Sequence, residues 1–462
     1  TIQLLTLPDS AYAAGVATTG NGLFTLPKVS AGKYVLKVSY IGFKNKFIPL
    51  HLYANVLNKN VGTVTLETDA IMLAEAVVTA EAPQVQVVED TLMYNSTAYR
   101  TPEGAMLEEL VKKLPGAEVD DDGNVKINGK ELKKIMAIDS PSGFTRKAAD
   151  YIMQQLREFG FEPELTRKGC VLCCLGGEGS PVVFSAHIDT LGGMVSEVKS
   201  NGRLKLTRIG GMNANNAECE NARVYTRDGK VFEGCFQMNN PSDHVNGEYD
   251  SQKRSYDNME LVLDEKVFSA DETKKLGIAT GDYVCFDPRI RITETGYIKS
   301  RFLDDKLSAA ILMGIAKAIK TEKLSLTRKV YIYLTVFEEV GHGCSSGIPA
   351  DAEEIISVDM GCVGDGLECK EHQVSICVKD SHGPYNYDVT SRFVELAKKH
   401  NLDYALDVYP FYGSDADAAL DAGYDLRHGL IGAGVYASHG YERSHIDGVK
   451  NTYELVKAYI TE

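Results

Sequence analysis

The chain has 462 residues, which suggests roughly three domains, since a globular domain averages about 150 residues. Hydrophobic residues make up 44% and charged residues 24% of it, a balance that excludes wholesale disorder. The formal net charge of −15 disfavours a nucleic-acid partner, because an acidic surface repels phosphate backbones. No apolar stretch approaches the roughly 18 residues of a membrane helix, so no transmembrane segment is expected.

The ten cysteines all lie beyond residue 169. Cys170, Cys173 and Cys174 form a cluster, but no second Cys-x-x-Cys pair follows that would complete a zinc knuckle. We therefore expect reduced, partly buried thiols, which favour a cytoplasmic location for the part of the chain that carries them.

Residues 1–68 are expected to form a small β-sandwich. Tyr34, Leu36 and Val38 alternate with other residues in the period-2 pattern of a strand. The stretch resembles the carboxypeptidase-regulatory-like β-sandwich in front of Bacteroidetes-type TonB-dependent receptors, and residues 69–134 resemble the start of the receptor plug or a linker. The motifs behind this resemblance are Ala17–Thr19, Val29–Tyr34, Ser39–Phe43, Ala76–Ala80 and Leu114–Gly116. The resemblance implies a module directed to the cell envelope or periplasm.

Near residue 135 the pattern changes to alternating helices and strands, without a Pro/Gly/Ser-rich linker. Ile152 and Leu156 have helical spacing, whereas Val182–Ala186 is an apolar run typical of a buried strand. A glycine-punctuated, strand-rich stretch then interrupts the alternation. We therefore predict an α/β domain, with a mixed sheet flanked by helices, made of residues 135–193 and 301–462 and split by a β-rich insertion of residues 194–300.

Three predicted strand or helix ends carry paired residues suited to metal chemistry. His187 and Asp189 follow the apolar run two residues apart, so their side chains can share one face of an extended chain. Asp304 and the next residue, Asp305, precede a helical repeat, where an aspartate can cap the helix or bridge two metal ions. Glu338-Glu339 ends a predicted strand, and two carboxylates there need either solvent or cations.

Further acids and histidines follow along the chain. Asp359 comes after Ile355-Ile356, and His439 and His445 lie near the C-terminus. With His187, Asp304 and Glu339, Asp359 and one C-terminal histidine offer two imidazoles and three carboxylates, which suit a pair of Zn²⁺ or Co²⁺ ions. Glu338 is the predicted general base, and Asp189 is expected to fix the tautomer of His187 through a hydrogen bond to its ring.

Residues from about 135 to 462 resemble the glutamyl or deblocking metallo-aminopeptidases, a family that includes the tetrahedral (TET) aminopeptidases. The matching motifs are Pro141–Phe144, His187–Asp189, Leu303–Lys306, Glu338–Gly341, Val358–Gly361 and Gly413–Ala416, with Arg208–Met212 and Leu276–Asp282 in the insertion. The resemblance implies that His187, Asp304 and Asp359 hold one metal, and that Asp304 bridges to a second held by Glu339 and the C-terminal histidine. It also implies that the insertion mediates assembly into a dimer or a larger homo-oligomer.

Three positions depart from the family pattern. Thr190 stands where the family usually has an acid, and His342 follows the Glu-Glu-Val-Gly motif in place of an apolar residue. His342 and Asp415 are therefore candidates for substrate contact. The C-terminal histidine has two candidates: an ungapped alignment favours His439, whereas the family's arginine aligned with Arg443 favours His445, which otherwise is a further substrate-binding candidate.

We predict a metal-dependent aminopeptidase that removes N-terminal residues from peptides by means of a water molecule activated by two metals. A related dimetal amidase or deacylase is the nearest alternative, because the same chemistry cleaves many amides. A non-catalytic envelope binding protein is the alternative from a different class.

Overall fold

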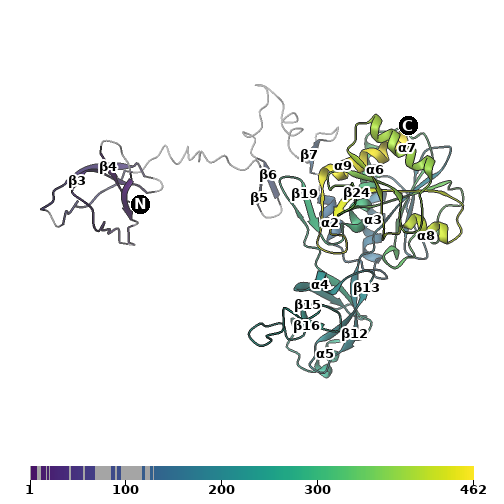
Figure 1. Cartoon of the computed structure of the whole chain (residues 1–462), viewed down its shortest axis with the longest axis horizontal. Coiled ribbons are helices and arrows are strands. Elements are labelled where there is room, and N and C mark those ends of the chain that lie inside the picture. The colour runs from purple at the N-terminus through teal and green to yellow at the C-terminus, as the bar shows by residue number, and fades with distance from the viewer. Residues whose placement is uncertain are drawn as a thin grey trace. The chain divides into compact units, whose positions relative to one another are not determined.

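The computed structural model describes two compact units, Thr1–Met106 and Leu107–Glu462 (Figure 1). The residues it describes are 2–7, 12–16, 18–19, 21–40, 43–55, 58–67, 85–88, 91–94, 117–119, 125–127 and 130–462.

The N-terminal unit contains a four-stranded antiparallel sheet. Its order is β2 (Tyr12–Val16), β1 (Ile2–Thr6), β3 (Gly32–Val38) and β4 (Lys46–Leu52). The predicted alternation in β3 is confirmed, since Tyr34, Leu36 and Val38 are buried against Ile2 and Leu4 of β1. The described residues of this unit do not include a second sheet packed on that core, so the sandwich is not confirmed.

Short hairpins occupy the described parts of residues 69–129. They are β5 (Val85–Val88) with β6 (Thr91–Tyr94), and β7 (Ala117–Val119) with β8 (Val125–Ile127). Two of the plug-like motifs, Ala76–Ala80 and Leu114–Gly116, lie outside the described residues. Helix α2 (Lys130–Met136) runs across the point near residue 135 where the sequence pattern changes.

The larger unit is built on an 11-stranded mixed sheet, as the α/β prediction requires. Its four central strands β20, β11, β21 and β24 are parallel, so their carboxyl ends open on one edge, where α/β proteins place their sites. The strand order is β18 (Arg291–Ile292), β19 (Tyr297–Ser300), β25 (Glu442–His445), β24 (Arg427–Tyr436), β21 (Glu354–Val363), β11 (Val182–His187), β20 (Val330–Thr335), β10 (Val171–Gly176) and β9 (Glu164–Leu165), with β22 (Val374–Lys379) pairing β24 and β23 (Tyr404–Val408).

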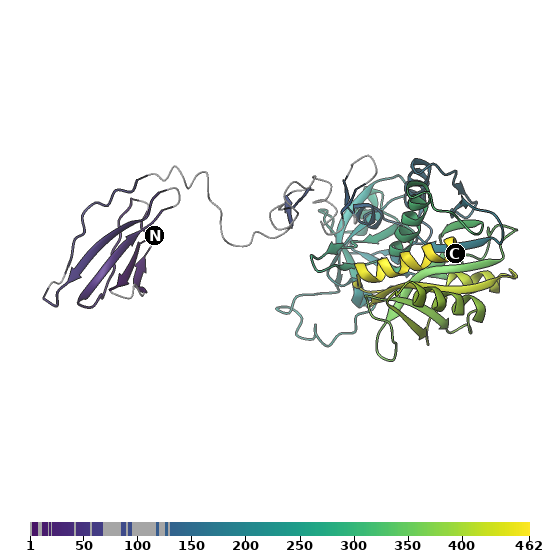
Figure 2. The same cartoon turned by 90° about the horizontal axis from the view of Figure 1, so that it is seen from above.

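Helices cover the sheet and bury the apolar positions that the periodicity predicted. They are α3 (Arg146–Glu158), α6 (Leu303–Thr321), α7 (Tyr387–Lys399), α8 (Asp415–Asp421) and α9 (Ile446–Thr461). Helix α9, yellow in Figure 2, packs against α6, α7 and β24. Ile152 and Leu156 of α3 are fully buried, which confirms the helical prediction. Among the described residues, no helix is both long and apolar enough to cross a bilayer.

A closed β-barrel interrupts the α/β unit between β11 and α6 and lies below the sheet in Figure 1. Its strands, in order around the barrel, are β12 (Gly192–Val198), β13 (Leu204–Ile209), β16 (Met259–Leu263), β15 (Val231–Met238), β14 (Glu220–Tyr225) and β17 (Tyr283–Phe286). The short helices α4 (Ala214–Ala217) and α5 (Ala270–Leu276) belong to the same stretch. Strands β18 and β19, which follow the barrel, join the main sheet through β25.

Replacing Phe393 by alanine is expected to lower the free energy of unfolding by about 3–5 kcal/mol, as for other buried aromatic residues. Phe393 on α7 is fully buried and its ring stacks on Tyr459 of α9, with ring centroids 4.4 Å apart. Denaturant unfolding of the full chain measures the change. The control is Phe411→Ala, because the Phe411 side chain is 95% exposed and its loss should cost less than about 0.5 kcal/mol. Equal effects of the two substitutions would contradict the packing of α7 on α9.

Candidate metal centre

Acidic side chains and imidazoles from separate stretches of the chain meet at the carboxyl edge of the parallel strands. His187 is the last residue of β11, and Glu338 and Glu339 form the one-turn 3-10 helix η2 (Glu338–Val340) after β20. Asp359 lies in β21, the parallel neighbour of β11, and Asp304 lies at the start of α6. Asp359 is inside its strand rather than at the end, since β21 continues to Val363. The sheet therefore brings these residues together although more than 100 positions separate some of them.

The carboxylate of Asp304 lies between two imidazoles. Its Oδ1 is 3.0 Å from Nε2 of His187, and its Oδ2 is 3.6 Å from Nε2 of His439. The same nitrogen of His439 is 3.7 Å from Oε2 of Glu339, and Nε2 of His187 is 3.7 Å from Oε2 of Glu338. Each oxygen of Asp304 thus faces a different histidine. This is the arrangement expected of a carboxylate that bridges two cations.

A second group of possible ligands contains His187, Asp305 and Asp359, whose ligand atoms lie within 4.8 Å of one another. Burial and the neighbouring charge of Asp304 raise the pKa of Asp359 to about 7. The two aspartates at the start of α6 both have non-helical backbone angles, which is the conformation of a residue that precedes a helix. The backbone of Asp305 is therefore compatible with capping the helix that continues from Lys306, and the capping alternative stays open.

The site has an excess of buried negative charge that a cation would neutralise. Burial raises the pKa of Glu338 and of Glu339 well above the ordinary value, and the neighbouring carboxylates raise it further. Two buried oxygens, Oδ1 of Asp305 and Oε1 of Glu339, have no hydrogen-bond partner. Within residues 132–462, the ion-pair partners of Asp304, Glu338 and Glu339 are imidazoles and not lysine or arginine. These residues therefore fit divalent cations, because unpaired buried carboxylates are otherwise costly.

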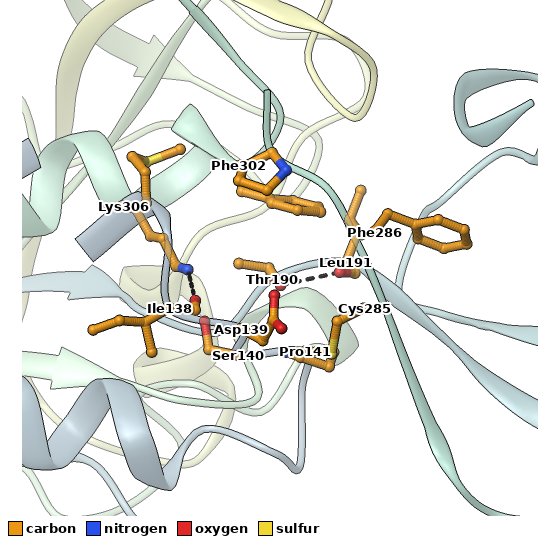
Figure 3. Close-up of a pocket in the computed structure, with 12 residues that line it drawn as sticks. Ile138, Asp139, Ser140, Pro141, Thr190, Leu191, Cys285, Phe286, Phe302 and Lys306 are labelled. Atoms are coloured by element: carbon orange, nitrogen blue, oxygen red, sulfur yellow. Dashed lines mark hydrogen bonds between the residues drawn. The ribbon is translucent and has the colours of Figure 1, made fainter. Parts of the chain in front are cut away.

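Lys306 is next to the acidic pair in the chain but does not neutralise it. Its buried ammonium donates to the backbone oxygen of Ile138, at the edge of a small cavity that also contains Asp139 (Figure 3). Burial lowers the pKa of Lys306 to about 8. Thr190, the departure from the family pattern, lines the same cavity and donates its hydroxyl to the backbone oxygen of Leu191 (Figure 3).

Asp189 holds the loop that carries the two glutamates. Its carboxylate accepts hydrogen bonds from the hydroxyl of Ser142 (2.5 Å) and from the backbone N–H groups of Glu338 (3.2 Å) and Glu339 (3.4 Å). Asp189 also forms the predicted hydrogen bond to the ring of His187, but through its backbone oxygen and not through its carboxylate. Nδ1 of His187 is 2.9 Å from the backbone oxygen of Asp189 and 3.7 Å from its carboxylate. The backbone oxygen therefore holds the Nδ1 proton, which leaves Nε2 free to face Asp304.

Glu442 is a buried residue of the centre to which the sequence interpretation assigned no role. Its carboxylate accepts the backbone N–H of His439 (3.0 Å) through one oxygen and that of Asp304 (3.1 Å) through the other. It thereby ties the start of α6 to the turn between β24 and β25. In the sequence, the position of Glu442 three residues after His439 is a signal for a contact with that histidine. The sequence has no comparable signal for its contact with Asp304, which lies 138 residues away.

His445, the alternative C-terminal histidine, lies outside this group. Its Nδ1 accepts the backbone N–H of Asp447 (3.1 Å) and caps α9, and its Nε2 is 2.8 Å from the backbone oxygen of Thr295. Both ring nitrogens are therefore engaged away from Asp304. The alternative that placed His445 at the metals or against substrate is wrong, because the residue serves as a helix cap.

Of the other two substrate-contact candidates, Asp415 is buried and His342 is exposed. Asp415 is only 1% exposed, and its carboxylate accepts hydrogen bonds from Thr335 and from the backbone N–H of Cys344 (2.9 Å). It is therefore enclosed behind the site and cannot touch a substrate as predicted. His342 is exposed, and its backbone oxygen accepts a hydrogen bond from Lys168 (2.6 Å).

Comparison with known proteins identifies the family. The profile described as M42 glutamyl aminopeptidase matches residues 169–455. The chain belongs to this family. The Bacillus subtilis (strain 168) protein named "Putative aminopeptidase YhfE" is 43% identical over 331 residues, which cover 71% of this chain and 96% of that protein. The glutamyl aminopeptidase of Lactococcus lactis subsp. cremoris is 24% identical over 215 residues, 46% of this chain and 59% of its own length.

Solved structures share the fold of the larger unit. The aminopeptidase APDkam598 of the archaeon Desulfurococcus kamchatkensis superposes with a TM-score of 0.65 at 23% identity, covering 72% of this chain and 94% of that one. The TET1 peptidase of Pyrococcus horikoshii, which assembles into a tetrahedron or a large octahedral shell, superposes with a TM-score of 0.64 at 21% identity, covering 72% of this chain and 99% of that one.

These findings confirm the predicted activity class. The chain is a metal-dependent aminopeptidase of a dinuclear metallopeptidase family, and the deacylase and binding-protein alternatives are not favoured. The family match begins at residue 169, so the receptor-like resemblance of residues 1–134 stays a prediction.

Proposed function

We propose that two divalent cations, Zn²⁺ or Co²⁺, bind at this centre with Asp304 as the shared ligand. His187 and Asp359 complete the first position, and Glu339 and His439 complete the second. The observation that carries the assignment is the carboxylate of Asp304, which has one oxygen toward each histidine. Two imidazoles and three carboxylates form a donor set typical of zinc and cobalt rather than of calcium or magnesium.

When bound, such cations polarise the scissile carbonyl and lower the pKa of a water molecule. Glu338 is the general base and acid: its carboxylate takes a proton from the attacking water and delivers it to the leaving amine. Burial raises the pKa of Glu338, which favours the uptake of a proton by its carboxylate. Asp189 keeps Glu338 in place by accepting its backbone N–H.

The substrates are peptides with a free N-terminal amine. The acidic residues that surround the centre favour a positively charged ammonium group over an acylated, neutral N-terminus. His342, exposed next to the glutamate loop, is the remaining predicted residue that can contact the substrate.

The enzyme consists of four segments. It assembles as a homo-oligomer, and it acts in a reducing compartment such as the cytoplasm. The segments are residues 1–68 and 69–134, the catalytic domain of residues 135–193 and 301–462, and an assembly domain within residues 194–300, whose last strands, β18 and β19, pair with the catalytic sheet and not with the barrel. Support for the assembly role comes from the oligomeric TET1 peptidase, whose fold the larger unit shares. Support for the compartment comes from the ten cysteines, all of which carry free thiols.

Counting bound ions tests the ligand assignment. His439→Ala is expected to reduce the metal content from two ions per chain to about one, because it removes one ligand of the second position only. His445→Ala is the matched control and should keep two ions, since that ring caps α9. Mass-spectrometric metal analysis after stripping with a chelator and reloading with Zn²⁺ measures both. The reverse result would overturn the assignment.

A further inference from the structure

The inserted barrel stretch reaches directly into the metal centre. Gly211, two residues beyond β13, lies so close to His439 that a Cβ built on it would be 2.4 Å from Nδ1 and 2.7 Å from Cε1 of the imidazole. No side chain fits in that space unless the ring moves. Gly211 does not have the positive φ that favours glycine, so the backbone itself would accept an alanine there.

A second residue of the insertion holds the backbone of the same histidine. The side-chain amide of Asn216, in α4, donates a hydrogen bond to the backbone oxygen of His439 (2.8 Å). Asn216 is itself anchored, because its backbone oxygen accepts a hydrogen bond from the guanidinium of Arg301 (2.7 Å). Arg301 is buried, pairs with Glu220 of β14 and stands three residues before Asp304.

His439 is therefore held on three sides. The carboxylate of Glu442, in the main sheet, accepts a hydrogen bond from the backbone N–H of His439, and the side-chain amide of Asn216 donates one to its backbone C=O. Gly211 leaves room for the ring because it has no side chain. Its backbone has a φ of +61°, a left-handed conformation that a non-glycine residue adopts only when its surroundings stabilise it. Two of the three contacts come from the inserted barrel stretch and not from the catalytic sheet.

We propose that Gly211 and Asn216 are positioning residues that orient His439 toward Asp304 and Glu339, so that the insertion is a structural part of the second metal position. The proposal rests on the proposed role of His439 as a ligand. Alanine at 211 forces the ring out of the position in which Nε2 faces the two carboxylates, and alanine at 216 removes the hydrogen bond to the backbone oxygen of His439. Neither change touches His187 or Asp359, so the first metal position is unaffected.

Zn²⁺ titration of the full-length, metal-stripped chain tests the proposal without reference to activity. For Gly211→Ala and for Asn216→Ala, the Kd of one ion, the same ion that His439→Ala removes, should rise by about 10- to 100-fold, the usual effect of losing a contact that orients a ligand. The Kd of the other ion should not change. The visible absorption of the Co²⁺-loaded protein should lose the contribution of one ion.

Matched controls separate this effect from general damage. Gly247→Ala introduces an alanine at another glycine of the insertion, one without positive φ and with open space around it, and Asn213→Ala removes an exposed asparagine three residues from Asn216. Both should bind two ions with unchanged Kd. If Gly211→Ala does not fold, Asn216→Ala provides the same readout.

His439→Ala, measured in parallel, distinguishes the two possible failures. If His439→Ala still binds two ions, the ligand assignment itself is wrong. If His439→Ala loses one ion but Asn216→Ala and any folded Gly211→Ala bind both ions normally, the ligand assignment stands and the positioning role is overturned.

Discussion

Replacing Glu338 by glutamine is expected to lower kcat for aminoacyl-anilide hydrolysis by about 10²–10⁴-fold, the usual contribution of a general base. Glutamine keeps the shape of the side chain but cannot take a proton from water or pass one to the leaving amine. Because Glu338 is not a proposed metal ligand, two ions per chain should still bind. Chromophore release with added Zn²⁺ or Co²⁺ measures the rate, and metal analysis checks the ion content.

Glu178→Gln is the matched control for this substitution, because Glu178 is exposed and precedes β11, whereas His187 of the centre ends that strand at the opposite edge of the sheet. It should retain the natural rate. Equal turnover by the Glu338 variant and the natural protein would show that another group exchanges the proton. Loss of both ions in the Glu338 variant would instead assign Glu338 to metal binding.

Replacing Asp304 by asparagine is expected to remove most of the thermal stabilisation that Zn²⁺ gives the natural protein, without stabilising the metal-free protein. In the metal-free protein, His187 and His439 lower the pKa of Asp304, so the variant loses these stabilising contacts and its melting temperature should not rise. With Zn²⁺, the natural protein gains about 2.7 kcal/mol per site when free metal is 100 times Kd. The variant should lose most of this gain at both sites, because Asp304 faces both histidines.

Thermal unfolding of the full chain with excess chelator and with excess Zn²⁺ measures both effects. Asp243→Asn, a substitution of the same type at an exposed position of the insertion, should behave as the natural protein does under both conditions. Equal stabilisation of natural and Asp304→Asn proteins by Zn²⁺ would refute the bridging role. Activity of the variant should fall below that of the Glu338→Gln protein.

Local patterns in the sequence predicted the elements that carry the centre. The apolar run 182–186 is the fully buried β11, and the helical repeat from Leu307 to Ile319 lies within α6. The pairs His187/Asp189, Asp304/Asp305 and Glu338/Glu339 follow or begin these elements, and parallel strands carry their carboxyl ends to one edge. Those signals are readable because they depend on side-chain periodicity within a few residues.

Local patterns were less reliable where the backbone departs from regular structure. Asp304 and Asp305 directly precede a helical repeat in the sequence, yet the backbone is non-helical at both and left-handed at Phe302. Asp415 has the form of a site residue in Gly413–Ala416, yet it is buried beneath Cys344. In each case contacts with distant residues decide the role.

The linear order of residues is enough to establish the α/β class, the aminopeptidase family, and a set of acidic residues and histidines that could bind two metal ions. It could not choose between His439 and His445, which are six positions apart in similar surroundings. The folded chain separates them, because a left-handed residue at 439 turns one ring toward Asp304 while the start of α9 takes the other as its cap. Glu442, Gly211 and Asn216 gain their meaning in the same way, since hydrogen bonds and steric contacts act across space between residues that are far apart along the chain.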